Sequence, residues 1–203
     1  MSSRRHSADR QLVEAWLAGA PDAARRLVAR LLPQVRKVLF RVLGPDAEYE
    51  DWVQETMFQA FKSLPRYRAE ASLETWVTHV AVNTAHQAFR KRRGREVSGA
   101  GATWEVDARE PPASPEGRAE RRELLRALYR LLDRLDEDKR LALALHELQG
   151  LPVSRVAELT GVPLSTAKSR IWFGRKELLR MARRDPVLGP LLEAARREGE
   201  GDG

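Results

Sequence analysis

The sequence predicts an all-α protein with two helical domains joined by a flexible linker. Apolar residues recur every three or four positions along most of the chain, which is typical of amphipathic helices, and strand-like alternation is absent. Residues 94–118 lack this period and concentrate Gly, Ala, Ser and Pro, which favours a linker. The 203 residues, 42% of them hydrophobic, suffice for two small cores.

Four amphipathic helices are expected in the first domain, residues 1–93. Apolar positions at helical spacing run through residues 12–16, 27–42 and 53–64, and a longer helix covers residues 72–93. Turn signals containing Gly or Pro separate them. Four such helices pack naturally as a bundle.

The second domain, residues 119–184, also reads as helical throughout. Helices are expected over 119–135 and 139–148, followed by a short helix near 153–159 and a longer one near 164–181. Residues 185–203 are expected to form a C-terminal tail whose polar end frays.

Charge is distributed in blocks along the chain. The net charge of +7 divides into +6 for residues 1–93, −2 for the linker, +6 for residues 119–184 and −3 for the tail. A basic balance also serves solubility, but two basic blocks on a tether are the pattern of two nucleic-acid-binding units.

Several classes of function are disfavoured. The absence of cysteine and the scatter of the four histidines make a metal site improbable, so no metal or cofactor is expected. No membrane insertion or secretory signal is expected, which predicts a cytoplasmic protein. No set of acid, base and nucleophile converges on a site, so we expect neither an enzyme nor a small-molecule substrate.

The chain from 153 to 180 has the features of a helix-turn-helix. A small Ala157 in the first helix and Gly161 in the turn allow two helices to cross closely. The second helix is expected to expose hydroxyls and cations suited to base edges and phosphates in a major groove. They are Ser165, Thr166, Lys168, Ser169, Arg170, Arg175 and Lys176. For any one of them, a solvated helix face is an equally good interpretation.

Residues 46–55 contain five acids and no base. On the following helix Asp51, Gln54 and Glu55 share one face, since they are spaced by three and four. Stabilisation of the helix dipole explains one or two acids rather than five. An acidic face on a basic protein therefore indicates a basic protein partner, because DNA would be repelled there.

Aromatic side chains are interleaved with amides and cations over residues 66–93. Tyr67, Trp76 and Phe89 alternate with Asn83, Gln87 and a basic run at 90–93. Such a surface can hold unstacked single-stranded bases. Trp76 taken alone fits a core position equally well, and His79 and His86 are expected on the helix surface without a ligand role.

Two blocks together resemble one family. Residues 46–85, DAEYEDWVQETMFQAFKSLPRYRAEASLETWVTHVAVNTA, resemble region 2 of the extracytoplasmic-function sigma factors. Residues 132–179, LDRLDEDKRLALALHELQGLPVSRVAELTGVPLSTAKSRIWFGRKELL, resemble their region 4. The order of the blocks and the linker between them agree with that family.

The resemblance implies an RNA polymerase sigma factor that directs promoter recognition and DNA opening, serving a stress or envelope-signal regulon. Its implied partners are core RNA polymerase, promoter DNA and an anti-sigma factor. The implied polymerase-binding residues are Asp51, Gln54 and Glu55. Those implied at the minus-ten element are Trp76, Asn83, Arg90 and Lys91, and those at the minus-thirty-five element are Ser165, Thr166, Lys168, Ser169, Arg170 and Arg175.

Two other classes remain as alternatives. A sigma-like decoy would bind an anti-sigma factor without initiating transcription. An ordinary helix-turn-helix regulator would leave the N-terminal block unexplained.

The chain departs from the family pattern at four positions. Phe173 and Gly174 stand where relatives usually carry a basic residue and a small helix former, and glycine costs about 1 kcal/mol in a helix interior. His79 replaces a common Arg or Lys, and Pro152 replaces a frequent serine cap. The preferred minus-thirty-five sequence therefore does not follow from the resemblance.

Overall fold

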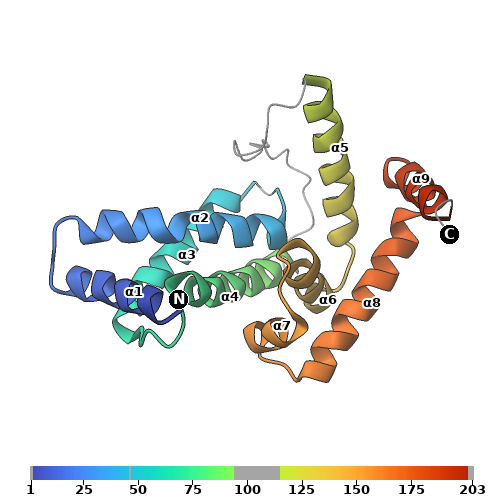
Figure 1. Ribbon diagram of the computed structural model, residues 1–203. Helices are drawn as coiled ribbons and strands as arrows, with labels where there is room; N and C mark the ends of the chain where they lie inside the picture. Colours follow the sequence, from blue (N-terminus) through green and yellow to red (C-terminus); the bar gives the residue numbers. More distant parts are fainter. Residues whose placement is uncertain (1, 46, 94–114, 201–203) are drawn as a thin grey trace. The chain divides into compact units, whose positions relative to one another are not determined.

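The computed structural model describes residues 2–45, 47–93 and 115–200, and within these ranges every regular element is a helix (Figure 1). The predicted all-α class is confirmed. The chain divides into two compact units, unit 1 with residues 1–100 and unit 2 with residues 101–203.

Unit 1 is built around helix α2. Its described elements are α1 (Ser2–Leu17), α2 (Ala23–Leu43), α3 (Tyr49–Ser63), the 3₁₀ turn η1 (Leu64–Arg66) and α4 (Leu73–Arg93). Helix α2 contacts α1, α3 and α4, so it forms the centre of the bundle. The apolar stripe expected on it is completely buried, at Leu27, Leu31, Val35, Val38 and Val42. Each such side chain stabilises the fold by roughly 1.5–3 kcal/mol.

Unit 2 packs its helices against α8. The described elements are α5 (Pro115–Leu132), α6 (Glu137–Leu143), one π-helical turn η2 (Ala144–Leu148), α7 (Val153–Thr160), α8 (Leu164–Ala182) and α9 (Leu188–Glu200). Helices α5, α6, α7 and α9 each contact α8. Ala167 and Ile171 of α8 are buried, so the opposite side of this helix faces solvent.

The turn between α7 and α8 depends on Gly161. Its backbone is left-handed, with φ +68°, a conformation that glycine adopts without the steric penalty of a Cβ. Its N–H donates to the carbonyl of Ala157 and thereby ends α7. Pro163 then precedes α8, and the predicted helix-turn-helix is present.

Two helix boundaries differ from the expectation. Helix α5 begins at Pro115, inside the expected linker, because proline fits the first position of a helix. Helix α9 occupies most of the expected C-terminal tail. Asp185 starts it by accepting hydrogen bonds from the N–H groups of Val187 at 2.9 Å and Leu188 at 3.1 Å. Asp185 was not predicted to start a helix.

None of the helices in the described ranges combines the length and apolar character that a membrane-spanning segment needs.

Candidate nucleic-acid interface

Helix α3 presents an exposed face, here the α3 face, formed by Asp51, Gln54, Glu55 and Phe58. Asp51 and Gln54 are exposed, and Glu55 is half-buried and accepts a hydrogen bond from the Gln59 amide at 2.7 Å. Phe58 is 61% exposed. Sequence reasoning missed Phe58, although its spacing of three and four from Glu55 and Gln54 was the signal that could have found it.

The acidic cluster is partly neutralised by neighbouring helices. The Glu50 carboxylate forms a bidentate ion pair with the Arg36 guanidinium of α2, at 2.9 and 2.7 Å. The Glu48 carboxylate lies 3.4 Å from the Lys91 ammonium group of α4. Asp46 lies outside the described residues. The acids that remain on the α3 face are therefore Asp51 and Glu55, fewer than the sequence count indicated.

Burial on the opposite side fixes the orientation of α3. Trp52 and Val53 are buried, and the Thr56 hydroxyl donates to the Trp52 carbonyl at 2.8 Å. Tyr49 anchors the first turn by donating its hydroxyl proton to the Arg36 carbonyl at 2.9 Å. Burial raises the pKa of Tyr49 to about 12, so the hydroxyl keeps this proton at neutral pH. The α3 face is thus held rigidly toward solvent.

Helix α4 carries the α4 stripe, formed by Trp76, Asn83 and Arg90. Their spacing of seven places them on one side of the helix. Asn83 and Arg90 are exposed, whereas Trp76 is half-buried and packs edge-on against Tyr67, with ring centroids 5.6 Å apart. Trp76 therefore contributes to packing and also reaches the surface.

Lys91, expected to act beside Arg90, lies off the α4 stripe. Its ammonium group is 3.4 Å from Glu48 and 5.1 Å from the centroid of the Trp52 ring. The structure thus brings three of the four expected minus-ten residues onto one stripe and places the fourth against α3.

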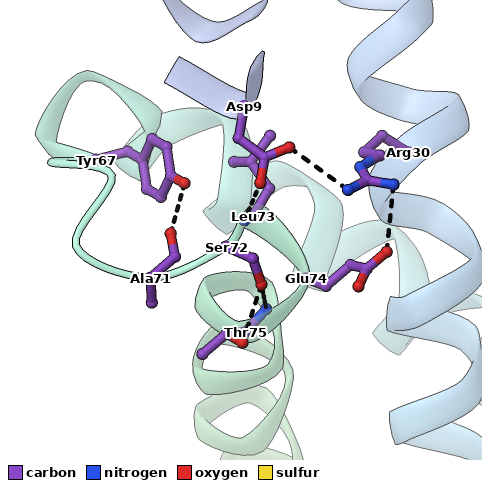
Figure 2. Close-up of polar contacts among 8 residues, drawn as sticks. All are labelled: Asp9, Arg30, Tyr67, Ala71, Ser72, Leu73, Glu74 and Thr75. Atoms are coloured by element: carbon purple, nitrogen blue, oxygen red, sulfur yellow. Dashed lines mark hydrogen bonds and ion pairs between the residues drawn. The ribbon is translucent and has the colours of Figure 1, made fainter. Parts of the chain in front are cut away.

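The start of α4 is held by a polar network (Figure 2). Ser72 caps the helix, its hydroxyl oxygen accepting from the Thr75 N–H at 3.1 Å. Asp9 of α1 reaches across to accept from the Leu73 N–H at 2.9 Å. One first-turn N–H of α4 is therefore satisfied by a residue 64 positions away along the chain.

The same network orders the loop before α4. Asp9 is only 4% exposed and lies 3.5 Å from Arg30, which is also 3.3 Å from Glu74. Tyr67 donates its hydroxyl proton to the Ala71 carbonyl at 2.6 Å (Figure 2). Burial, and next the negative charge of Asp9, raise the pKa of Tyr67 to about 12, so this bond persists at neutral pH. The Tyr67 ring that supports Trp76 is thereby fixed.

Replacing Asp9 tests this network. Asp9→Ala leaves the Leu73 N–H without its acceptor, which is expected to lower the free energy of unfolding by about 1–3 kcal/mol. Glu14→Ala, which removes an exposed acid from the same helix, should change it by less than about 0.5 kcal/mol. Urea titration measures both, and native-state hydrogen exchange should locate the loss at the start of α4. Equal effects of the two variants would contradict a capping role for Asp9.

Helix α8 turns a polar and basic side toward solvent. Ser165, Lys168 and Ser169 are exposed in its first two turns, and Thr166 is half-buried. These two turns follow directly after the Gly161 turn. In a helix-turn-helix, the N-terminal residues of the second helix are the ones that contact bases. The structure thus keeps these four predicted residues on the open side of the helix-turn-helix.

Arg170 and Arg175 instead pair with acids of unit 2. Arg170 forms an ion pair with Asp138 at the start of α6, and Arg175 pairs with Glu147 of η2. Arg175 and Glu147 also line an apolar groove of about 260 Å³ between α5, η2 and α8. A DNA contact by either arginine requires exchange of an existing partner, which the sequence could not reveal.

An exposed aromatic pair follows on α8. Trp172 is 55% and Phe173 is 52% exposed, and their rings meet edge-on with centroids 4.7 Å apart. The Lys176 ammonium lies 5.2 Å from the centroid of Trp172. Phe173 therefore lies on the solvent side of α8.

Gly174 lies on the buried side of α8, where that helix meets α6. A Cβ at this position would be 3.3 Å from the Lys139 carbonyl oxygen and 3.7 Å from the Leu143 Cβ. The glycine therefore lets the two helices approach closely, which offsets its low helix propensity.

Substitutions at Gly174 should depend steeply on size. Gly174→Leu is expected to destabilise unit 2 by about 1–3 kcal/mol through overpacking. Gly174→Ala should be nearly neutral, because a gain in helix propensity of about 1 kcal/mol opposes the tight contact. Thermal unfolding of both variants measures this. A leucine variant as stable as the wild type would contradict close packing.

Together the described residues define a two-domain helical protein with an exposed acidic face on α3, a stripe of aromatic, amide and basic side chains on α4, and a helix-turn-helix formed by α7 and α8. The family model described as Sigma-70 region 2 matches residues 27–95, and that described as Sigma-70, region 4 matches residues 125–178. The two matches fall on unit 1 and unit 2 respectively.

Sequence similarity to known proteins extends over nearly the whole chain. The chain is 31% identical to the RNA polymerase sigma-H factor of Pseudomonas aeruginosa, covering 92% of this chain and 97% of the relative. It is 30% identical to the ECF RNA polymerase sigma-E factor of Escherichia coli, covering 84% and 92%. The chain belongs to the extracytoplasmic-function group of the sigma-70 family of transcription initiation factors.

Solved structures show the same fold. CnrH in complex with the cytosolic domain of CnrY is 21% identical with a TM-score of 0.61, covering 88% of this chain and 99% of that one. The sigma factor RpoE in complex with the anti-sigma factor NepR from Bartonella quintana is 19% identical with a TM-score of 0.59, covering 81% and 99%.

Proposed function

We propose that this sigma factor binds core RNA polymerase through the α3 face, opens promoter DNA along the α4 stripe and recognises the upstream promoter duplex with α8. The observation that carries the proposal is the presence, on one chain, of an acidic face and two surfaces suited to nucleic acid. An acidic face repels DNA, so it serves a protein partner, whereas the other two surfaces serve DNA.

The α3 face has the composition of a protein-binding surface. Asp51, Gln54 and Glu55 complement a basic partner, and Phe58 supplies an exposed apolar centre of the kind that anchors interfaces. Core polymerase is the partner that the family implies. Phe58 thus adds an anchor to the three residues predicted from the sequence.

The α4 stripe is suited to unstacked bases. Trp76 offers a partly exposed ring for stacking, Asn83 offers an amide that can hydrogen-bond a base edge, and Arg90 offers a cation for the backbone. Lys91 contributes only after leaving Glu48 and the Trp52 ring. We assign minus-ten recognition to this stripe and residues 1–93 to the first domain.

Helix α8 is suited to duplex DNA. Ser165, Thr166, Lys168 and Ser169 present hydroxyls and a cation at the start of the recognition helix. Arg170 and Arg175 would join them by exchanging Asp138 and Glu147 for DNA. We assign minus-thirty-five recognition to residues 119–184, with α5 extending that domain to Pro115.

DNA opening explains why polymerase binding comes first. Separating base pairs loses stacking of about 1.4 kcal/mol per step, and flipping bases costs a few kcal/mol more. A chain of 23.0 kDa offers too little surface to offset this alone. The polymerase must hold the displaced strands, so the chain would act in the cytoplasm as part of a holoenzyme.

An anti-sigma factor is a further proposed partner. Both similar structures above are complexes with a second protein, the cytosolic domain of CnrY in one and the anti-sigma factor NepR in the other. A partner of this kind would silence the present chain by covering the surfaces that bind polymerase or DNA. The competing decoy hypothesis shares this partner but excludes transcription.

Transcription from fragmented bacterial DNA distinguishes the two hypotheses. Core polymerase is incubated with the fragments, with and without the full chain, then challenged with heparin before nucleotides are added. Heparin-resistant RNA should rise well above the level of core polymerase alone. A chain that joins core polymerase but leaves RNA at that level would be a decoy.

A further inference from the structure

Phe173 is an exposed aromatic residue in the middle of helix α8. It lies seven residues after Thr166 and four after Ser169, so it continues their side of α8 for another turn. It is 52% exposed, whereas most other large apolar side chains in the described part of unit 2 are buried or half-buried. The ring is therefore available to a partner rather than used in the core.

Trp172 holds the Phe173 ring in place. The two rings meet at 82° with centroids 4.7 Å apart, and this edge-on contact limits the rotation of Phe173. Lys176 in turn lies against the Trp172 ring. Phe173 is thus a supported apolar group that is presented at a fixed place on the helix.

The surroundings of the pair favour DNA over a protein. Lys168, Lys176 and Arg180 are exposed around it. The acid of this part of α8, Glu177, is already paired with Lys139 at 3.0 Å. A cationic rim complements a polyanion, and the apolar groups within it need an apolar feature of that polyanion. In the major groove the distinguishing apolar feature is the 5-methyl group of thymine.

We propose that Phe173 is a specificity-determining residue that recognises the 5-methyl group of a thymine in the upstream promoter element. The proposal rests on the proposed function, because it places α8 in a major groove. Phe173 lies nine residues after the first residue of α8, about 14 Å along the helix, so the contacted thymine lies beyond the bases reached by Ser165 and Ser169.

Replacing thymine by deoxyuridine tests the proposal, since it removes only the methyl group. Holoenzyme made from the full chain and core polymerase is first used to select duplexes from a library with a randomised upstream segment. Each thymine of the selected segment is then replaced in turn. Wild type, Phe173→Ala and Phe173→Arg are compared in equilibrium binding, with Leu191→Ala as a control that truncates an exposed leucine of α9.

One thymine should stand out for the wild type. Losing a buried methyl group at that position should weaken binding about four-fold. Phe173→Ala should bind the thymine duplex about as weakly as the wild type binds the deoxyuridine duplex, and it should no longer distinguish thymine from deoxyuridine. Leu191→Ala should behave as the wild type does. Phe173→Arg should also lose the methyl preference while its binding falls more steeply with salt, by about one phosphate contact.

Three results would overturn the proposal. Selected duplexes could lack an enriched thymine, every deoxyuridine replacement could leave wild-type binding unchanged, or the methyl effect could persist in Phe173→Ala. Failure of the proposed function would give another result, namely that chain and core polymerase together retain no duplex selectively. The two failures can therefore be distinguished.

Discussion

Charge reversal at Asp51 and Glu55 is expected to prevent holoenzyme formation at concentrations that saturate the wild-type chain. These two acids remain on the α3 face after Glu48 and Glu50 are paired internally. Lysine at both positions would place like charges against a basic surface at a cost of several kcal/mol. Each 1.4 kcal/mol corresponds to a ten-fold loss of affinity, so the loss should exceed a hundred-fold. Titration of labelled chain with core polymerase measures it.

The control is a second double reversal with the same change in net charge. Glu14 and Asp22 are exposed acids of unit 1 that lie outside α3, and each pairs with an arginine three or four residues away along the chain. Glu14→Lys with Asp22→Lys should bind core polymerase nearly as the wild type does. Equal loss in both double variants would mean that overall charge, rather than the α3 face, governs binding.

The second large effect is expected on promoter opening at Asn83. Asn83→Ala should lower the fraction of open complexes about ten-fold while holoenzyme formation and upstream duplex binding are retained. The exposed amide is proposed to contact an unstacked base, and such base contacts contribute about 1–3 kcal/mol. Permanganate reactivity of thymines in the opened region measures the effect.

Two comparisons make this prediction specific. Gln11→Ala removes an exposed amide from α1 and should leave opening unchanged. Trp76→Ala should reduce opening and also stability, because Trp76 packs on Tyr67. Normal permanganate reactivity in Asn83→Ala would remove Asn83 from the minus-ten site. A Trp76→Ala defect that scales with loss of folding alone would assign Trp76 to the core.

The sequence predicted the features that depend on local pattern. The apolar period of α2 and the Gly161 turn specify their structures almost independently of distant residues, because burial of a stripe and a left-handed turn are local requirements. The side-by-side placement of Asp51 and Gln54 likewise follows from helix spacing. The helices that carry the candidate surfaces therefore lie where the sequence predicts them.

The features that depend on distant neighbours could not be predicted. Lys91, Arg170 and Arg175 look like free cations in the sequence, yet each pairs with an acid on another element. Which acid lies within reach is decided only when the helices pack.

The roles of Gly174 and Asp9 also depend on distant neighbours. From the sequence alone, Gly174 only lowers the helix propensity of α8. Its packing role follows from the Lys139 backbone, which lies close to it in the folded unit. Asp9 has no local sequence signal, because it accepts a hydrogen bond from Leu73, which lies 64 positions further along the chain.

Mapping of transcript starts tests most directly whether both units act together on one promoter. Minus-ten and minus-thirty-five elements lie roughly 50–60 Å apart on B-DNA. The residues between the described parts, 94–114, can span about 70–75 Å when extended, so simultaneous contact is geometrically allowed. Sequencing of RNA 5′ ends made by core polymerase with the chain should give new starts that share two elements at one constant spacing. Starts that share a single element, or that match those of core polymerase alone, would contradict recognition by two units.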